Sequence, residues 1–197
     1  MQLIFRMKKL NKYRIHLLIV IIALLTSCAT QRVSTIVGCD YDEKTNQTDY
    51  FVLPYGTVSI PGKWEKTNYN SISRQQFFKN ADSVIIAVAF GPYDKYEFNA
   101  DKSKKGIDFA LAYYEWDSKY FVETHGLKRD FIEKDSIRNF VVYRIFGEIE
   151  KGKFDTYFLV GERNGFVSNY SVMDTDKWTE KHKTDFLKRL FVNEKEE

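Results

Sequence analysis

The chain has 197 residues, of which 44% are hydrophobic, and it contains 10 Gly and 3 Pro, a composition that excludes a disordered chain or a repeat array. Its 30 Lys and Arg against 27 Asp and Glu give a formal net charge of +3, but five of the basic residues precede Cys28 and no acidic residue does. From Cys28 onward, 25 basic residues face 27 acidic ones. This balance gives no electrostatic case for binding nucleic acid.

The first segment of the chain has the parts of an export signal. Basic residues at positions 6, 8, 9, 12 and 14 are followed by the apolar run 17–25 and then by the small residues Thr26 and Ser27. The apolar run is shorter than the roughly 18 residues that a membrane-spanning helix needs. The segment therefore predicts that the chain is exported and that the apolar run is removed.

The end of this signal, Leu25-Thr26-Ser27-Cys28, resembles the lipobox of bacterial lipoproteins, in which an aliphatic residue and two small residues precede a cysteine. The resemblance implies that residues 1–27 are a lipoprotein signal peptide and that Cys28 is the lipid attachment site, acylated by chains such as palmitate. Residues 28–35 would then form a lipidated tether between the membrane and the domain. Two or more acyl chains on Cys28 would make this anchor stable. An ordinary cleaved signal and an uncleaved anchor are the alternatives.

Two further expectations follow from the lipobox. Lipoproteins retained in the inner membrane of enteric bacteria typically carry Asp after the cysteine, whereas this chain has Ala29, which favours the cell outer membrane with the domain facing the periplasm. With Cys28 acylated, Cys39 has no cysteine to pair with. Because no His neighbours Cys39, we expect a small buried side chain there and not a reactive thiol.

Short apolar runs in the first half of the chain predict strands. These runs lie at residues 36–39, 50–53, 58–60, 72–79 and 84–90. Residues 40–47 read as a turn-rich loop, and its carboxylates do not fit a calcium loop because Lys44 and Thr45 occupy the positions of an oxygen ligand and a glycine. The run 84–90 is apolar without alternation, which predicts a sheet covered on both faces.

The second half begins with a predicted helix from Ile107 to about Val122, which ends near Gly126. Four strands of a meander are then expected, at residues 127–134, 137–149, 154–161 and 166–173. The dipeptide Asn164-Gly165 predicts a tight hairpin between the last two strands, because a type I′ turn needs positive φ at both central positions.

A second helix is predicted at the end of the chain. Asp174 is its expected N-cap, and Met173 and Trp178 are placed around it like a hydrophobic staple. Its apolar face comprises Trp178, Phe186, Leu187, Leu190 and Phe191. Since the strand 137–149 carries apolar residues on both of its faces, the two helices are the natural covers of the meander.

The order of these elements, together with the Pro-Gly-x-Trp turn at residues 61–64, resembles the Mog1/PsbP/DcrB-like superfamily over residues 50–192. The resemblance implies an α+β fold, an antiparallel β-sheet meander covered by two main helices in an αβα sandwich, with residues 36–197 as a single domain. Members of this superfamily are mostly binding or assembly factors. They share no catalytic residues that could be carried over to this chain.

The sequence predicts no catalytic residues, no metal site and no cofactor apart from the covalent lipid on Cys28. Three histidines are present, His16 in the signal, His125 and His182, and we expect His182 to be a packed residue on the apolar face of the last helix. No lipase-type serine elbow, zinc-protease motif, CxxC pair or phosphate-binding glycine loop occurs. We therefore expect a protein that is not an enzyme.

The predicted helix 107–122 carries two apolar stripes. Ile107, Leu111, Tyr114 and Phe121 share the face that packs on the sheet, and the opposite face carries a second stripe of aromatic residues, Phe109, Tyr113, Trp116 and Tyr120. Loops such as residues 91–105 or the N-terminal segment could cover this second stripe, or it could be an exposed surface for a ligand or partner. The solvent exposure of Tyr113, Trp116 and Tyr120 distinguishes the two.

These observations lead to one expected function and two alternatives. The expected protein is a membrane-anchored cell-envelope lipoprotein whose domain binds or scaffolds an envelope protein partner. The alternatives are an immunity or inhibitor lipoprotein that occupies the cleft of an enzyme, and an envelope enzyme with an unrecognised site.

Overall fold

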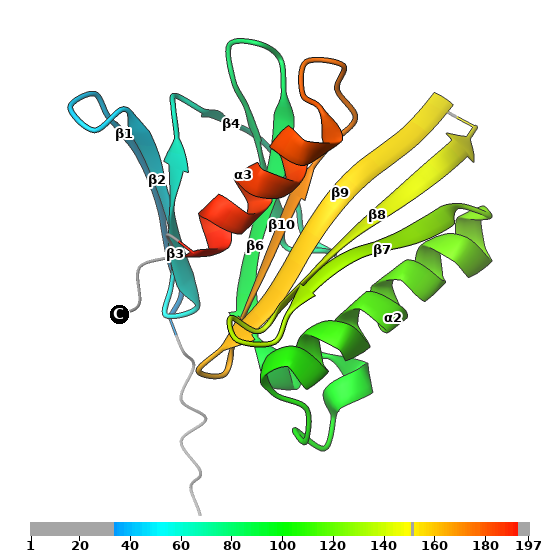
Figure 1. Cartoon of the computed structure of the whole chain (residues 1–197). Coiled ribbons are helices and arrows are strands. Elements are labelled where there is room, and N and C mark those ends of the chain that lie inside the picture. Colours follow the sequence, from blue (N-terminus) through cyan, green and yellow to red (C-terminus); the bar gives the residue numbers. More distant parts are fainter. Residues whose placement is uncertain (1–33, 151, 193–197) are drawn as a thin grey trace, which may run out of the picture. The chain divides into compact units, whose positions relative to one another are not determined.

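The computed structural model describes residues 34–150 and 152–192, so the predicted signal peptide, Cys28 and the tether up to residue 33 lie outside the described residues. From Thr35 onward the chain forms one compact unit. It opens with three strands (Figure 1), β1 (Ile36–Asp42), β2 (Gln47–Leu53) and β3 (Gly56–Pro61). Three more strands follow, β4 (Glu65–Asn70), β5 (Gln75–Lys79) and β6 (Ile85–Pro92).

Two short 3₁₀ helices, η1 (Tyr93–Lys95) and η2 (Glu97–Asn99), lead into the long helix α2 (Gly106–His125). The meander consists of β7 (Lys128–Asp135), β8 (Phe140–Ile149), β9 (Gly152–Arg163) and β10 (Phe166–Val172). The helix α3 (Glu180–Val192) closes the described chain. In the described part of the chain, neither α-helix combines the length and the apolarity that spanning a membrane requires.

The strands form two antiparallel sheets. β1, β2 and β3 make a three-stranded sheet, and the other strands make a seven-stranded sheet in the order β4-β5-β6-β10-β9-β8-β7. The last strand of the described residues, β10, therefore lies in the middle of the large sheet, where it pairs with β6 on one side and β9 on the other. The predicted meander is confirmed as the half of this sheet that runs from β10 to β7.

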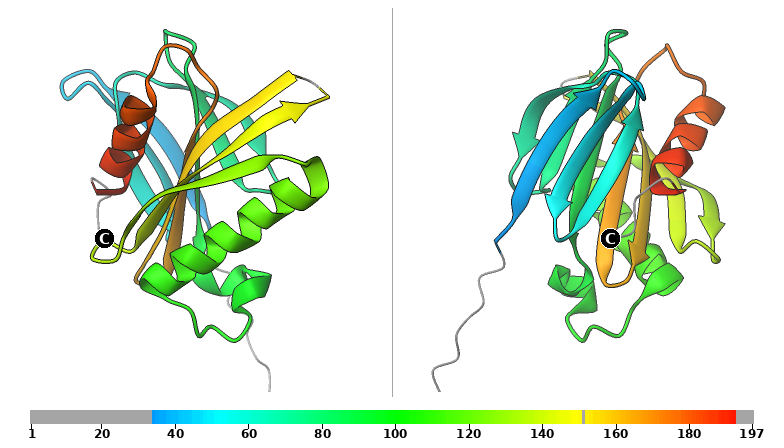
Figure 2. Two further views of the ribbon diagram at one scale, coloured as in Figure 1. Left: turned by 45° about the vertical axis from the view of Figure 1, so that its right-hand side comes forward. Right: turned by 90° about the vertical axis from the view of Figure 1, so that its left-hand side faces the viewer.

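The large sheet is covered on both faces, as the apolar runs predict (Figures 1 and 2). α2 packs across β7, β8 and β9 on one face, while α3 and the three-stranded sheet cover the other. Alternate residues of β8 point to the two sides, since Val141 and Tyr143 belong to the core under α2, and Phe140 and Val142 to the core under α3. The fold class is α+β, with two main helices on an antiparallel sheet.

Two local turn predictions are confirmed by the backbone. Gly126 ends α2 in the left-handed conformation, with φ of 65°, and its N–H donates to the carbonyl oxygens of Phe121 and Val122. At the β9–β10 hairpin, Asn164 and Gly165 have φ of 52° and 85°. Positive φ at both positions matches the type I′ requirement that the dipeptide suggested.

Two predictions about the first strands need correction. Residues 40–47 are not one loop, because β1 continues to Asp42 and β2 begins at Gln47, which leaves a short turn between them. The first three strands also form a sheet of their own, which the apolar runs along the sequence do not predict. Apolar side chains of this sheet, such as Tyr50 and Ile60, complete the core beneath α3.

The start of the last helix also differs from the prediction. α3 begins at Glu180, and the side chain of Thr179 accepts the backbone N–H of His182 at 3.2 Å, in the position predicted for Asp174. We attribute the later start of α3 to Trp178, whose ring centre lies 6.3 Å from that of Trp64. This contact holds the chain before the helix against the core in a non-helical conformation, so Asp174 lies in the preceding loop and takes no part in capping.

Candidate functional site

The aromatic stripe predicted on α2 divides into a buried half and an exposed half. Phe109 and Tyr113 belong to the core between α2 and the sheet, so they cannot contribute to an exposed surface. Trp116 and Tyr120, one and two turns further along α2, are 37% and 56% exposed. The covering alternative therefore applies to Phe109 and Tyr113, whereas Trp116 and Tyr120 are left exposed.

The cover over the buried half comes from the 3₁₀ segment, as the first alternative proposed. The ring of Tyr96 lies 5.4 Å from that of Phe109 and 5.3 Å from that of Tyr113. Phe98 lies 5.3 Å from Phe109 on the same side. These edge-on and tilted contacts are the arrangements that aromatic rings prefer.

Trp116 is exposed but held in place. Its indole Nε1–H donates to Glu97 Oε1 at 2.6 Å, and its ring lies 5.6 Å from the rings of Phe98 and Tyr113. Tyr120 follows one turn later on the same side of α2. We call the exposed pair the Trp116–Tyr120 surface. It presents a fixed indole beside a phenol ring.

Polar groups lie beneath α2 on its sheet side. Asp117 Oδ2 accepts a hydrogen bond from the Tyr143 hydroxyl of β8 at 2.6 Å. Burial raises the pKa of Asp117 to about 6, although the bond from Tyr143 works in the opposite direction. Asn169 of β10 donates to the Tyr113 hydroxyl at 2.7 Å, and its own Oδ1 has no hydrogen-bond partner among the described residues.

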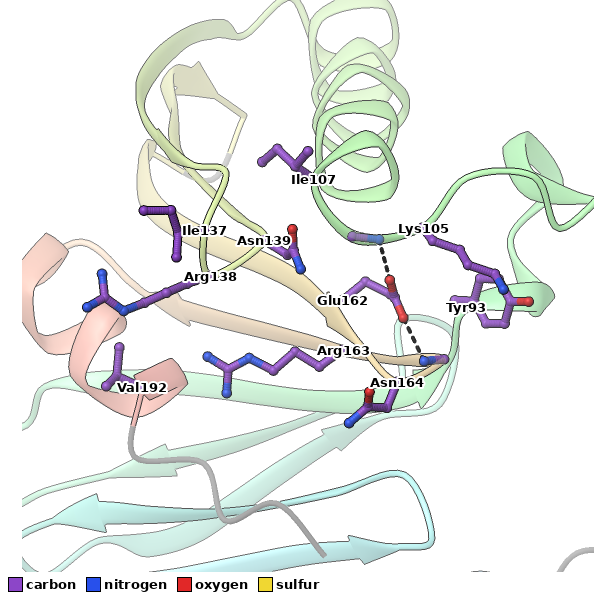
Figure 3. Close-up of a pocket in the computed structure, with 12 residues that line it drawn as sticks. Tyr93, Lys105, Ile107, Ile137, Arg138, Asn139, Glu162, Arg163, Asn164 and Val192 are labelled. Atoms are coloured by element: carbon purple, nitrogen blue, oxygen red, sulfur yellow. Dashed lines mark hydrogen bonds between the residues drawn. The ribbon is translucent and has the colours of Figure 1, made fainter.

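A recess of about 1040 Å³ lies at the end of the large sheet where two chain reversals meet the start of α2 (Figure 3). Its walls are the start of α2 at residues 105–107, the β7–β8 turn at 137–139 and the β9–β10 hairpin at 162–165, with Tyr93 and Val192 at the sides. We call it the hairpin basin. Its volume is slightly above the range of about 300 to 1,000 Å³ found for small-molecule sites.

Glu162 joins the three walls of the hairpin basin. Its carboxylate accepts the backbone N–H of Gly106 at the start of α2 and that of Gly165 in the hairpin, the latter at 2.6 Å (Figure 3). Its own N–H donates to the Asn139 carbonyl in the β7–β8 turn at 3.3 Å. Glu162 is buried, and its bonds hold the three walls of the basin together.

Three cations border the basin, and each has a contact that orients it. The Arg163 guanidinium lies 3.9 Å from the centre of the Phe191 ring, and Arg138 pairs with Asp135 at 2.8 Å. Lys105 Nζ lies 5.7 Å from the centre of the Tyr93 ring. In Figure 3 the two arginines extend towards Val192, while Lys105 lies beside Tyr93 at the opposite end.

The two histidines and the cysteine within the described residues are the remaining candidates from the sequence. His182 is exposed and stacks on Trp178 at 4.5 Å, so the expectation of a packed core histidine is wrong, and His125 is exposed near Tyr120. Cys39 is partly buried, and burial raises the pKa of its thiol. Within residues 34–150 and 152–192, no three His, Cys, Asp or Glu side chains form a group that could hold a metal ion.

No family model matches the chain, and no curated protein matches it either. Among solved structures, it is similar to a 1.50 Å crystal structure from Bacteroides thetaiotaomicron VPI-5482, with 10% identity and a TM-score of 0.43, over 73% of this chain and 45% of that chain. This chain thus spans less than half of that one. It is also similar to the solution structure of cyanobacterial PsbP (CyanoP) from Synechocystis sp. PCC 6803, with 11% identity and a TM-score of 0.40, over 87% of this chain and 98% of that chain.

Proposed function

We propose that the protein is a cell-envelope lipoprotein, anchored through a lipid on Cys28, whose α+β domain binds or scaffolds an envelope protein through the Trp116–Tyr120 surface. The anchor rests on the sequence alone, on the basic start, the apolar run and Leu25-Thr26-Ser27-Cys28. The binding role rests on one observation, the part-exposed indole of Trp116 that is already fixed by Glu97 and by neighbouring rings.

A fixed, exposed aromatic side chain suits protein binding for two reasons. Trp and Tyr are enriched among the residues that contribute most to protein interfaces, because they bury much apolar area and keep one polar group for hydrogen bonding. A side chain held by its own contacts also loses little conformational freedom on binding. Trp116 meets the second condition through the bond from its Nε1–H to Glu97 and its contact with Phe98, and its exposed ring supplies apolar area for a partner.

The binding surface can be tested by photo-crosslinking in cells of the source bacterium. A photoreactive phenylalanine analogue at position 120 should give a discrete crosslinked protein, whereas the same analogue at Tyr69 should not. Tyr69 is the matched control, because it is 57% exposed but lies on β4 at the far edge of the large sheet. The Trp116→Ala change should reduce crosslinking from position 120 about tenfold or more, as expected for truncation of a central aromatic residue.

Each outcome of the crosslinking experiment has a defined meaning. Equal crosslinking from positions 69 and 120, or an unchanged yield in the Trp116→Ala variant, contradicts the proposed surface. If the captured partner is an enzyme that the domain inhibits, the immunity or inhibitor alternative replaces the scaffolding role.

The anchor is tested separately by metabolic labelling with palmitate. The wild-type protein should incorporate the label, and Cys28→Ser should abolish incorporation because the sulfur that receives the diacylglyceryl group is lost. Cys39→Ser is the matched control and should label like the wild type. Label that persists in Cys28→Ser, or a precursor that is processed normally in the presence of globomycin, contradicts the lipoprotein proposal.

A further inference from the structure

Exposed apolar side chains lie at the end of the domain from which the tether leaves. Ile36 and Val37, the first residues of the edge strand β1, are 59% and 52% exposed. The β2–β3 turn lies beside them, because Ile36 pairs with Leu53, the last residue of β2. Apolar side chains left open at the edge of a sheet favour contact with another surface.

Two further turns extend this apolar area. The Tyr55 ring in the β2–β3 turn lies 6.1 Å from that of Phe166, which begins β10 and is 37% exposed. Gly165, next to Phe166, lines the hairpin basin together with Ile137, whose side chain is 92% exposed. Figures 1 and 2 show the start of β1, the β2–β3 turn and the β9–β10 hairpin at the same end of the domain. We call the exposed members the tether-end patch, which comprises Ile36, Val37, Ile137 and Phe166.

The far end of β1 has the opposite character. Asp40 and Asp42 are exposed there, and the turn to β2 continues with the exposed Glu43 and Lys44. One strand thus changes from apolar residues beside the tether to charged residues at its other end. This gradient indicates that water surrounds the far end and that the tether end lies against an apolar or amphiphilic surface.

The length of the tether limits which surface that can be. From Cys28 to Thr35 the chain can span at most about 25 Å. A folded domain of this length is roughly 40 Å across. Because the tether is shorter than the domain is wide, a lipid on Cys28 would keep the tether end of the domain close to the bilayer.

We propose that the tether-end patch lies on the surface of the phospholipid bilayer that holds the Cys28 lipid. The inference rests on the anchor proposed above and adds the orientation of the domain. Anchoring raises the local concentration of bilayer at the patch, so apolar contacts too weak to bind a free domain suffice to orient an anchored one. The Trp116–Tyr120 surface stays open in this orientation, because α2 starts beside the hairpin basin and these two residues lie in its second half.

The experiment measures how close single positions come to the lipid chains. The lipidated full chain carries Cys39→Ser, so a fluorescent thiol label reacts only with one introduced cysteine, since the sulfur of Cys28 is bonded to lipid. Ile137→Cys reports on the patch, and Thr45→Cys, exposed in the β1–β2 turn, is the control at the far end of β1. The vesicles consist of phosphatidylcholine, which has no net charge, with a nitroxide quencher on the acyl chain.

The label at position 137 should be quenched at least about threefold more than the label at position 45. Apolar groups enter the boundary between headgroups and acyl chains, whereas the far turn is a strand length away. Raising the salt concentration from about 0.1 to 0.5 M should leave the quenching unchanged, because salt screens contacts between charges and not contacts between apolar groups.

Substitutions within the patch provide a second test. Phe166→Ser should at least roughly halve the quenching at position 137, because the patch loses its largest apolar side chain. Ile85→Ser is the matched control and should leave the quenching unchanged. Ile85 is 37% exposed, like Phe166, but it lies at the other end of β6 from Pro92, the partner of Phe166. Ile36→Ser combined with Val37→Ser should act like Phe166→Ser, and more than half of each side chain is already exposed, so folding should be kept.

Two results would overturn the inference and leave the anchor intact. One is equal quenching at positions 137 and 45, or equal effects of Phe166→Ser and Ile85→Ser. The other is a label at position 137 that is shielded from iodide in water but not quenched by the lipid nitroxide, which would show that a second copy or the tether covers the patch. Mass spectrometry of the purified chain tests the anchor separately, and a chain without lipid on Cys28 would refute the anchor and this inference with it. Circular dichroism of each variant, with a wild-type spectrum required, separates lost contact from lost folding.

Discussion

Replacement of Glu162 by alanine is expected to lower the free energy of unfolding by about 3 to 4 kcal/mol, because it removes the acceptor of two backbone N–H groups and leaves a cavity. The donors belong to Gly106 at the start of α2 and to Gly165 in the β9–β10 hairpin. A buried donor without an acceptor costs about 1 to 3 kcal/mol. The change therefore affects three segments that are far apart in the sequence.

Urea unfolding of the wild type and of three variants measures this effect. Glu162→Gln keeps one carbonyl oxygen as an acceptor and should lie between the wild type and Glu162→Ala. Glu148→Ala is the control, since Glu148 is an exposed residue of β8, and its effect should stay within about 0.5 kcal/mol. A loss below about 1 kcal/mol for Glu162→Ala would show that water replaces the carboxylate at both donors.

Replacement of Asp117 by asparagine is expected to stabilise the protein at pH 7 by about 3 kcal/mol and to have little effect near pH 3.5. Burial raises the pKa of Asp117 from 3.8 to about 6 in the folded protein. Below pH 3.8 the carboxyl group is protonated in both states and carries no penalty. As the pH rises to about 6, ionisation favours the unfolded chain, so the wild type loses stability that the asparagine variant keeps.

The difference in unfolding free energy between Asp117→Asn and the wild type, measured in urea at pH 3.5, 5 and 7, is the relevant quantity. Asp135→Asn provides a control of opposite sign, because hydrogen bonds from the Arg138 backbone and side chain lower the pKa of Asp135. It should destabilise the protein at pH 7 and lose its effect as the pH falls. A difference for Asp117→Asn that does not change between pH 3.5 and pH 7 would refute the buried ionisation.

Predictions that depend on neighbouring residues agreed best with the structure. Gly126 and Asn164-Gly165 each require a backbone conformation that few residue types adopt, so the sequence names the turn directly. The exception is the N-cap assigned to Asp174. Capping residues compete with packing, and the contact of Trp178 with Trp64, distant in sequence, moved the start of α3 to Glu180.

The candidate surface could be predicted in part. Helical spacing identified Trp116 and Tyr120, but it could not distinguish them from Phe109 and Tyr113, because the cover comes from another segment. A signal for that cover was present in the sequence, since Tyr93, Tyr96 and Phe98 interrupt a mainly polar stretch. Aromatic residues in a polar loop indicate that the loop folds back onto a core.

The hairpin basin left no mark in the sequence as a site. Its turns were recognised singly, but Lys105, Arg138 and Arg163 border one basin only because the start of β8, the end of β9 and the start of α2 lie at the same end of the sheet. Strand order depends on pairings between distant segments. Periodicity along the chain carries no information about which strands become neighbours.

The central position of β10 also determines when the domain can fold. Pro92 pairs with Phe166 and Ile86 with Val172, so the two halves of the large sheet are joined by a strand close to the end of the described chain. Contacts between such distant residues close large loops and slow folding. During synthesis, the edges of β6 and β9 therefore stay open until β10 has emerged, and the domain completes its main sheet late.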